Sequence, residues 1–120
     1  MKHLLLILGS LLLVFSSCKK EEKKHDVIYK VVVIGGSPSY SVTYSSSGNT
    51  TQTAGPFSAS KWVSPTISDR KAGSLVSLTL KGGSGGSYNM YIYVNGRLEK
   101  EDRMDDPYGP RTISVELPED

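Results

Sequence analysis

The chain has 120 residues but only one cysteine, two histidines and one tryptophan. Cys18 has no partner in the chain, so packing rather than a disulfide must stabilise the folded part. Catalysis by a serine nucleophile needs a base within hydrogen-bond reach, usually a histidine. His3 and His25 both lie near the N-terminus, outside the expected folded domain. We therefore expect no enzymatic activity, no cofactor, and no imidazole or thiolate metal site.

An excess of charge of one sign is also missing. The first 25 residues hold five of the fourteen Lys and Arg residues and two of the twelve Asp and Glu residues. Nine basic and ten acidic residues therefore remain from Asp26 onward. A nearly neutral domain lacks the basic surface with which proteins bind nucleic acid, so no nucleic-acid partner is expected.

The chain has no apolar run long enough to span a bilayer, which takes about 20 residues as a helix. Its longest run is Leu4–Phe15, which follows a positive start at Lys2 and precedes the small residues Ser16 and Ser17. This three-part arrangement is typical of a secretory signal peptide. We assign residues 1–17 to that signal peptide.

The small pair followed by Cys18 resembles the lipobox of bacterial lipoproteins, although Phe15 stands where that box usually has Leu. The resemblance implies cleavage before Cys18, acylation of its thiol and its new amine, and an outer-membrane location. One acyl chain holds a protein only marginally, so several chains would make the attachment stable. The alternative is that Cys18 is an incidental residue in an ordinary signal peptide.

Residues 18–26 contain the expected lipidated cysteine and a charged, flexible tether. The segment Lys19–His25 has no apolar residue to bury, which predicts disorder. It is either a solvated spacer or an export signal, because Lys20-Glu21-Glu22 resembles the Lys-then-acidic signal of Bacteroidetes cell-surface lipoproteins. The interleaved glutamates argue against contact with anionic headgroups.

Residues 27–120 are expected to form a single all-β domain. Apolar and polar residues alternate with the period of two that indicates half-buried strands, and no helical period appears. Asn95-Gly96 predicts a type I′ hairpin turn. About seven short strands of this kind indicate an immunoglobulin-like antiparallel β-sandwich. The predicted strands are Val27–Ile34, Tyr40–Ser45, Lys61–Val63, Val76–Lys81, Tyr88–Val94, Arg97–Met104 and Thr112–Leu117.

Five short motifs in this order resemble the MmpS-like domain of small exported proteins, including many Bacteroidetes lipoproteins. They are Tyr29–Val31, Ser41–Tyr44, Lys61-Trp62, Leu75–Leu78 and Ile92–Leu98. The resemblance implies an immunoglobulin-like sandwich. Mycobacterial members accompany lipid-exporting transporters and carry a transmembrane helix, whereas this chain has the features of a lipid anchor.

Two groups of residues are candidate sites. Tyr91 and Tyr93 share one face of a predicted strand, where they could bind a protein or stack on sugar rings; packing across strands is the alternative. Trp62 is a further candidate for this binding surface, or a core anchor. The cluster Asp102, Asp105 and Asp106 is a candidate Ca²⁺ site, although its spacing does not match an EF-hand and also suits a solvated turn.

These observations predict a lipid-anchored, non-enzymatic envelope lipoprotein that serves as an accessory module. Its partners would be the membrane, through the lipid anchor, and another envelope protein or a transporter. The alternative function is a cell-surface lipoprotein that binds glycans or small ligands. Both functions require an exposed binding surface on the sandwich.

Overall fold

The computed structural model describes residues 24–36, 39–48, 50–82, 86–105 and 110–119. Cys18, Asp106, the predicted signal peptide and most of the predicted tether lie outside these residues. No helix in the described part is long and apolar enough to cross a membrane. The described residues form nine strands: β1 (Lys24–Gly35), β2 (Tyr40–Ser45), β3 (Thr51–Phe57), β4 (Lys61–Val63), β5 (Ile67–Lys71), β6 (Leu75–Gly82), β7 (Ser87–Val94), β8 (Arg97–Asp105) and β9 (Arg111–Glu116).

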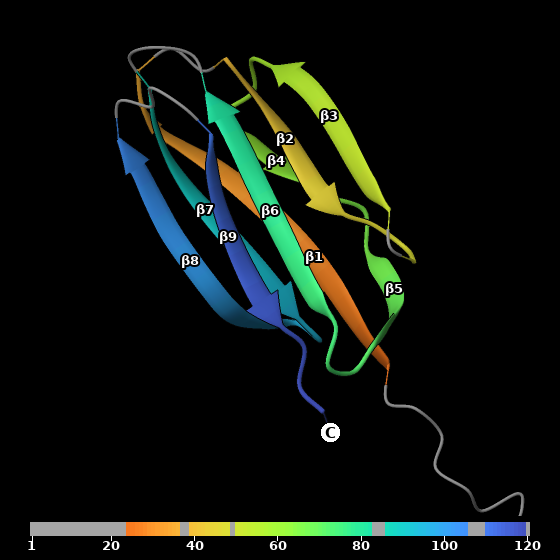
Figure 1. Ribbon diagram of the computed structural model, residues 1–120. Helices are drawn as coiled ribbons and strands as arrows, with labels where there is room; N and C mark the ends of the chain where they lie inside the picture. The colour runs from red at the N-terminus through yellow and green to blue at the C-terminus, as the bar shows by residue number, and fades with distance from the viewer. Residues whose placement is uncertain (1–23, 37–38, 49, 83–85, 106–109, 120) are drawn as a thin grey trace, which may run out of the picture.

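The strands form two antiparallel sheets that pack as the two layers of a sandwich (Figure 1). In the five-stranded sheet the order is β4-β1-β7-β8, and β5 also pairs with β1. The four-stranded sheet has the order β3-β2-β6-β9. The predicted all-β antiparallel sandwich is therefore confirmed.

The core lies between the sheets and follows from the period of two in the strands. In β7, Tyr88, Met90, Ile92 and Val94 are buried while the residues between them are partly exposed. Strands β1, β2 and β6 alternate in the same way. Burial of these side chains is the main stabilising contribution, at about 1.5–3 kcal/mol for each large apolar residue.

Two strands, β3 and β5, were not predicted because they bury few apolar side chains. In β3 only Ala54 and Phe57 pack against the core, and Pro56 is tolerated because β3 is an edge strand. In β5 only Ile67 and Arg70 are buried. Neither sequence shows a clear alternation of apolar and polar residues.

The first strand starts three residues earlier than predicted, so Lys24, His25 and Asp26 belong to the sheet rather than the tether. His25 is buried, and its ring nitrogens have partners. The Asn95 amide Nδ2 lies 2.8 Å from Nδ1, and the Pro118 carbonyl oxygen lies 2.9 Å from Nε2. Because the amide donates, Nδ1 accepts and Nε2–H donates to Pro118. Because both ring nitrogens of His25 have hydrogen-bond partners, the polar segment Lys24–Asp26 can form part of the sheet.

Candidate functional site

The outer face of the five-stranded sheet carries the two candidate tyrosines. Tyr91 and Tyr93 alternate with buried residues of β7, so both rings point away from the core. The rings stack with centroids 6.2 Å apart and an interplanar angle of 30°. Both rings remain partly exposed, so together they form a small aromatic platform.

Neighbouring strands extend this platform. Lys30 of β1 pairs with Tyr91, and its Nζ lies 5.7 Å from the ring centroid, within the range of a cation–π contact. Ile28 pairs with Tyr93 on one side and Leu98 pairs with it on the other. We call these five residues, Ile28, Lys30, Tyr91, Tyr93 and Leu98, the tyrosine face.

The surroundings of the tyrosine face combine apolar and charged side chains. Val63 of β4 pairs with Lys30 and is 47% exposed, and Leu98 is 41% exposed. On the opposite side, Glu101 pairs with Tyr91, and Arg103 follows two residues later on the same face of β8. The tyrosine face therefore mixes aromatic and apolar side chains with the charge of Lys30, and Glu101 and Arg103 add charges toward the β8 edge. Protein–protein interfaces also combine aromatic and apolar residues with polar surroundings.

Trp62 does not belong to the tyrosine face. It pairs with the buried Val31 and therefore points toward the other sheet. Its ring lies 5.4 Å from that of Tyr44 and 6.0 Å from that of Phe57, between centroids. Trp62 is thus partly buried against the core, and the three aromatic candidates do not form one surface.

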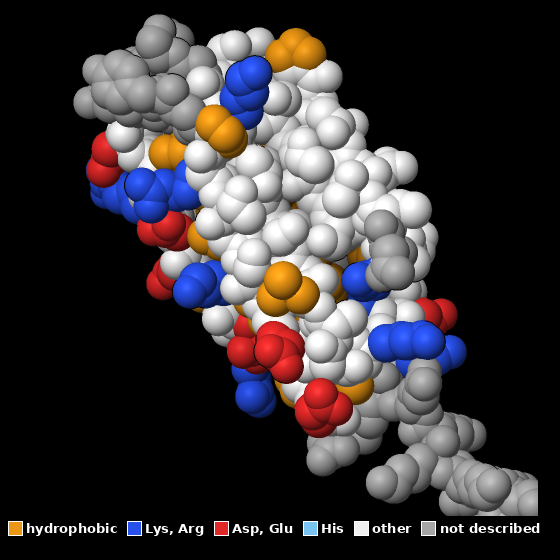
Figure 2. All heavy atoms as spheres, in the orientation of Figure 1, with side chains coloured by type: hydrophobic (Ala, Val, Ile, Leu, Met, Phe, Trp, Pro, Cys, Tyr) orange, Lys and Arg blue, Asp and Glu red, His pale blue; other side chains and the backbone are white. Residues whose placement is uncertain are grey.

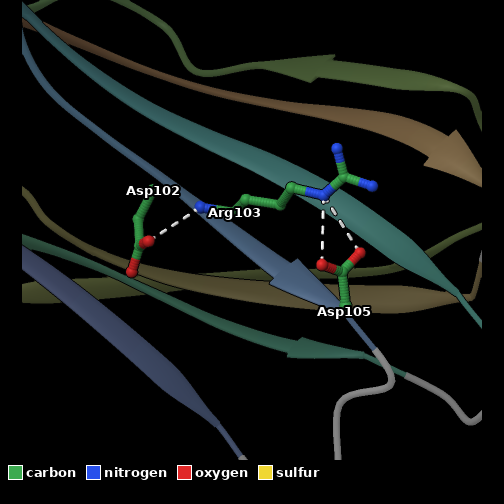
Figure 3. A network of polar contacts seen from close by, with 3 residues as sticks. All are labelled: Asp102, Arg103 and Asp105. Carbon is green, nitrogen blue, oxygen red and sulfur yellow. Dashed lines mark hydrogen bonds and ion pairs between the residues drawn. The ribbon is translucent and has the colours of Figure 1, made fainter.

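The carboxylates of Asp102 and Asp105 do not converge. They lie three residues apart on β8 and therefore point to opposite faces of the strand. Asp102 accepts a hydrogen bond from the Arg103 backbone N–H at 2.8 Å, while the Arg103 side chain extends to Asp105, with Nε 3.0 Å from Oδ1 (Figure 3). Asp102 also pairs with Arg111 of β9, at 2.8 Å between Oδ2 and Nη1.

Arginine contacts therefore neutralise both aspartates. The hydrogen bond from Arg111 lowers the pKa of Asp102, with a smaller contribution from the Arg103 backbone. Hydrogen bonds from Ser87 and then Arg103 lower the pKa of Asp105. Within the described ranges, no three His, Cys, Asp or Glu residues are placed to hold a metal ion.

The opposite outer face, on the four-stranded sheet, has a different composition. Thr53, Thr43, Thr79 and Thr112 occupy one row across its four strands. The hydroxyls of Thr43 and Thr53 are 3.0 Å apart, and those of Thr79 and Thr112 are 2.7 Å apart. A second row follows along the strands, made of Thr51, Ser45, Ser77 and Ser114.

We call these two rows the serine/threonine face. In Figure 2, which looks onto this sheet, the middle is mostly free of charged side chains, and Lys, Arg, Asp and Glu lie toward the margins. Sequence reasoning missed it because the rows depend on strand order and register. The only signal in the sequence is a Ser or Thr at every second position of several strands. Its hydroxyls carry no charge, and Leu75, which is 63% exposed, lies on the same face at the start of β6.

Comparison with known proteins gives no family for this chain. No protein-family model matches the sequence. No curated protein matches it either.

Proposed function

We propose that the protein is a non-enzymatic, lipid-anchored accessory module of the outer membrane that binds another envelope protein through the tyrosine face. The stacked, partly exposed rings of Tyr91 and Tyr93, with the exposed Leu98 beside them, are the observation on which the proposal rests. The serine/threonine face carries one strongly exposed apolar side chain, Leu75, at 63%, but no exposed pair of aromatic rings among the described residues. The stacked rings therefore favour the tyrosine face as the docking surface.

The short distance to the proposed anchor restricts the kind of partner. Lys24, the first residue of β1, is six residues after Cys18, so the two can lie at most about 20 Å apart. Tyr93 pairs with Ile28, four residues further along β1, or about 13 Å. A partner that covers the tyrosine face would thus lie close to the bilayer, which favours a membrane-embedded protein or a second lipoprotein.

The resemblance to the MmpS-like family supports an accessory role beside an export machine. The resembling segment Ile92–Leu98 forms the hairpin between β7 and β8, which carries Tyr93 and Leu98. One of the five resembling motifs therefore contributes directly to the proposed docking surface. The more specific proposal is that the protein associates with a transporter.

The docking proposal is tested by crosslinking in the intact envelope. We expect a Tyr91→Ala/Tyr93→Ala double variant of the full chain to lose a crosslinked complex that the wild type forms. The matched control is Thr43→Ala/Thr79→Ala, which changes two residues of the serine/threonine face and should preserve the complex. Recovery of the same complex with the tyrosine variant would contradict the proposal.

Glycan binding is a second candidate, favoured by the stacked, partly exposed rings of Tyr91 and Tyr93. Sugar rings stack on such platforms through their apolar C–H faces, and the tyrosine hydroxyls can bond to sugar hydroxyls. A glycan array decides this point. Binding that disappears in Tyr91→Ala would support the candidate, whereas an unchanged signal would remove these tyrosines from consideration.

The proposed anchor is tested separately. Cells given labelled palmitate should incorporate the label into the wild-type chain, and a Cys18→Ser variant should remain unlabelled and move to the aqueous phase in detergent partitioning. A wild-type chain without label would disprove the lipid anchor. It would not affect the result obtained for the tyrosine face.

A further inference from the structure

Arg70, near the end of β5, is a charged residue that the sequence analysis did not single out. Its side chain is only 7% exposed. Nη1 donates to the carbonyl oxygens of Ser46, at 2.7 Å, and Gly48. Nε is buried and has no hydrogen-bond acceptor among the residues that the structure describes.

Among the described residues, Arg70 forms no ion pair. Neither of the ion pairs between described residues involves Arg70. Burying a guanidinium is costly unless a carboxylate, or another anion, compensates the charge. Two carbonyl oxygens satisfy one nitrogen but do not neutralise the cation. An anion beside Arg70 would supply what the described protein groups do not.

A pocket of about 400 Å³ opens at this arginine. It is lined by Arg70 itself, by Gly48 of the loop between β2 and β3, by Asp69 and Lys71 on either side of Arg70, and by Ser74. This volume lies in the range of small-ligand sites. Figure 2 shows Lys and Arg side chains on the right of the molecule, where Figure 1 places β5.

The geometry of the guanidinium indicates the class of ligand. Both carbonyl contacts use Nη1, so no described residue accepts a hydrogen bond from Nη2, and Nε is buried. Guanidinium N–H groups without a protein acceptor suit the oxygens of a carboxylate or phosphate. Lys71 adds a second positive charge to the wall, whereas Asp69 adds a negative one.

We propose that this pocket binds an oxyanion, a phosphate or carboxylate group held by the guanidinium of Arg70. Arg70 pairs with His25 and Lys71 pairs with Lys24, so the pocket lies where β1 enters the sandwich. If the chain is anchored through Cys18, this end is the one nearest the lipid. The phosphate can therefore belong to a lipid headgroup or to a small free molecule.

The test follows the Nε–H signal of Arg70 by NMR in the full chain, kept in a neutral detergent. Inorganic phosphate and acetate are titrated separately, against sodium chloride at the same ionic strength. We expect phosphate or acetate to give a saturable shift of the Arg70 Nε–H and of the Gly48 and Ser74 amides. Shifts that do not saturate, or that chloride reproduces, would overturn the proposal.

Substitutions separate ligand binding from a purely structural role of Arg70 in tying the β2–β3 loop. Arg70→Lys keeps the positive charge but loses the planar guanidinium donors, so affinity should fall about tenfold or more. Arg103→Gln, which removes an exposed arginine from a surface ion pair, should leave affinity within about twofold of wild type. Wild-type affinity in Arg70→Lys would overturn the proposal. If that variant does not fold, the wild-type titration still decides.

Two further titrations distinguish the sources of the phosphate. One uses free glycerol phosphate, and the other uses micelles doped with phosphatidylglycerol. A saturable shift of the Arg70 Nε–H with the lipid alone assigns the site to a headgroup, and one with the free compound assigns it to a small anion. A shift with neither counts against a phosphate ligand and leaves the acetate titration to decide for a carboxylate. The proposal fails if acetate also gives no saturable shift.

Discussion

Buried tyrosines bring hydroxyl groups into the sandwich, and carbonyl oxygens at its ends accept their hydrogen bonds. The pairs are Tyr29 with Ser45, Tyr40 with Ala59, and Tyr88 with Ser39, at 2.9, 3.1 and 3.2 Å. A buried hydroxyl without such a partner would be costly. Each tyrosine therefore joins core packing to a fixed loop position. Burial raises the pKa of Tyr29 to about 12, and it also raises the pKa of Tyr40.

Because the pKa of Tyr29 is raised, the free energy of unfolding should decrease as the pH rises into the alkaline range. The neutral phenol stabilises the fold fully below pH 10, the value for an exposed tyrosine, and this contribution is lost as pH rises through about 12. Tyr29→Phe should cost about 1 kcal/mol at pH 8, since the Ser45 carbonyl loses its donor. The difference in unfolding free energy between wild type and Tyr29→Phe should shrink above pH 10.

Urea unfolding of the full chain between pH 8 and 11.5 measures this difference. Tyr91→Phe is the control, because the Tyr91 ring is partly exposed on the outer face. A gap between wild type and Tyr29→Phe that stays constant over the whole range would contradict the assignment.

Whether a given side chain is buried or exposed could be predicted only in part from the sequence. Alternation along β7 correctly separated Tyr91 and Tyr93 from the buried face. Trp62 sits in a strand of three residues, too short for alternation to reveal its face. Burial of His25 and Arg70 depends on partners from distant segments, Pro118 and Ser46, which no local pattern identifies.

The hairpin between β7 and β8 is the element whose conformation was clearest in the sequence. Asn95 and Gly96 have φ angles of 53° and 80°, as the predicted type I′ turn requires. The Asn95 side chain also accepts a hydrogen bond from the Asp26 backbone N–H, at 3.0 Å. The turn therefore connects the hairpin to the start of β1.

Gly96→Ala should destabilise the protein by about 1–2 kcal/mol, the usual cost of the left-handed conformation for a residue with a Cβ atom. No atom lies within 4 Å of the Cβ that would be added, so the cost comes from the backbone alone. Thermal or urea unfolding of the full chain measures it. Gly35→Ala is the matched control: its Cβ would meet Ser87 at an ordinary 3.8 Å, without a positive φ. Equal effects of the two substitutions would contradict this explanation.

The two sheets are joined along one side by an ion pair as well as by the core. Asp102 comes from β8 in the five-stranded sheet, and Arg111 comes from β9 in the four-stranded sheet. The pair lies on the surface, where such contacts contribute about 0.2–1 kcal/mol. It reinforces a boundary at which backbone pairing does not continue from one sheet to the other.

Because of this ion pair, the free energy of unfolding should decrease as the pH falls into the acidic range. Because the pKa of Asp102 is lowered from 3.8, its contribution is present above that value and is lost as pH falls through the folded-state pKa. Asp102→Asn should cost about 0.5 kcal/mol at pH 7, and this difference from wild type should vanish in acid. Urea unfolding at pH 7 and below pH 3.8 tests it, with the exposed Glu101→Gln as control. A difference that persists in acid would argue against the pair.

The fold class could be predicted from the sequence because apolar alternation recurs in most strands. The assignment of strands to sheets could not, since β1 pairs with β7 and β6 pairs with β9 across long stretches of chain. Strand register also depends on contacts between segments that are far apart in the chain. For that reason the sequence of one strand predicted part of the tyrosine face, whereas the serine/threonine face became apparent only from the pairing of four strands.

The serine/threonine face has a consequence for a chain held on a crowded surface. Removing water from its hydroxyls yields little unless a partner replaces each hydrogen bond, so the two rows give neighbouring molecules little to adhere to. Leu75, which is 63% exposed on the same face of β6, is the apolar exception. Contacts between crowded copies should therefore be weaker over the hydroxyl rows than at Leu75.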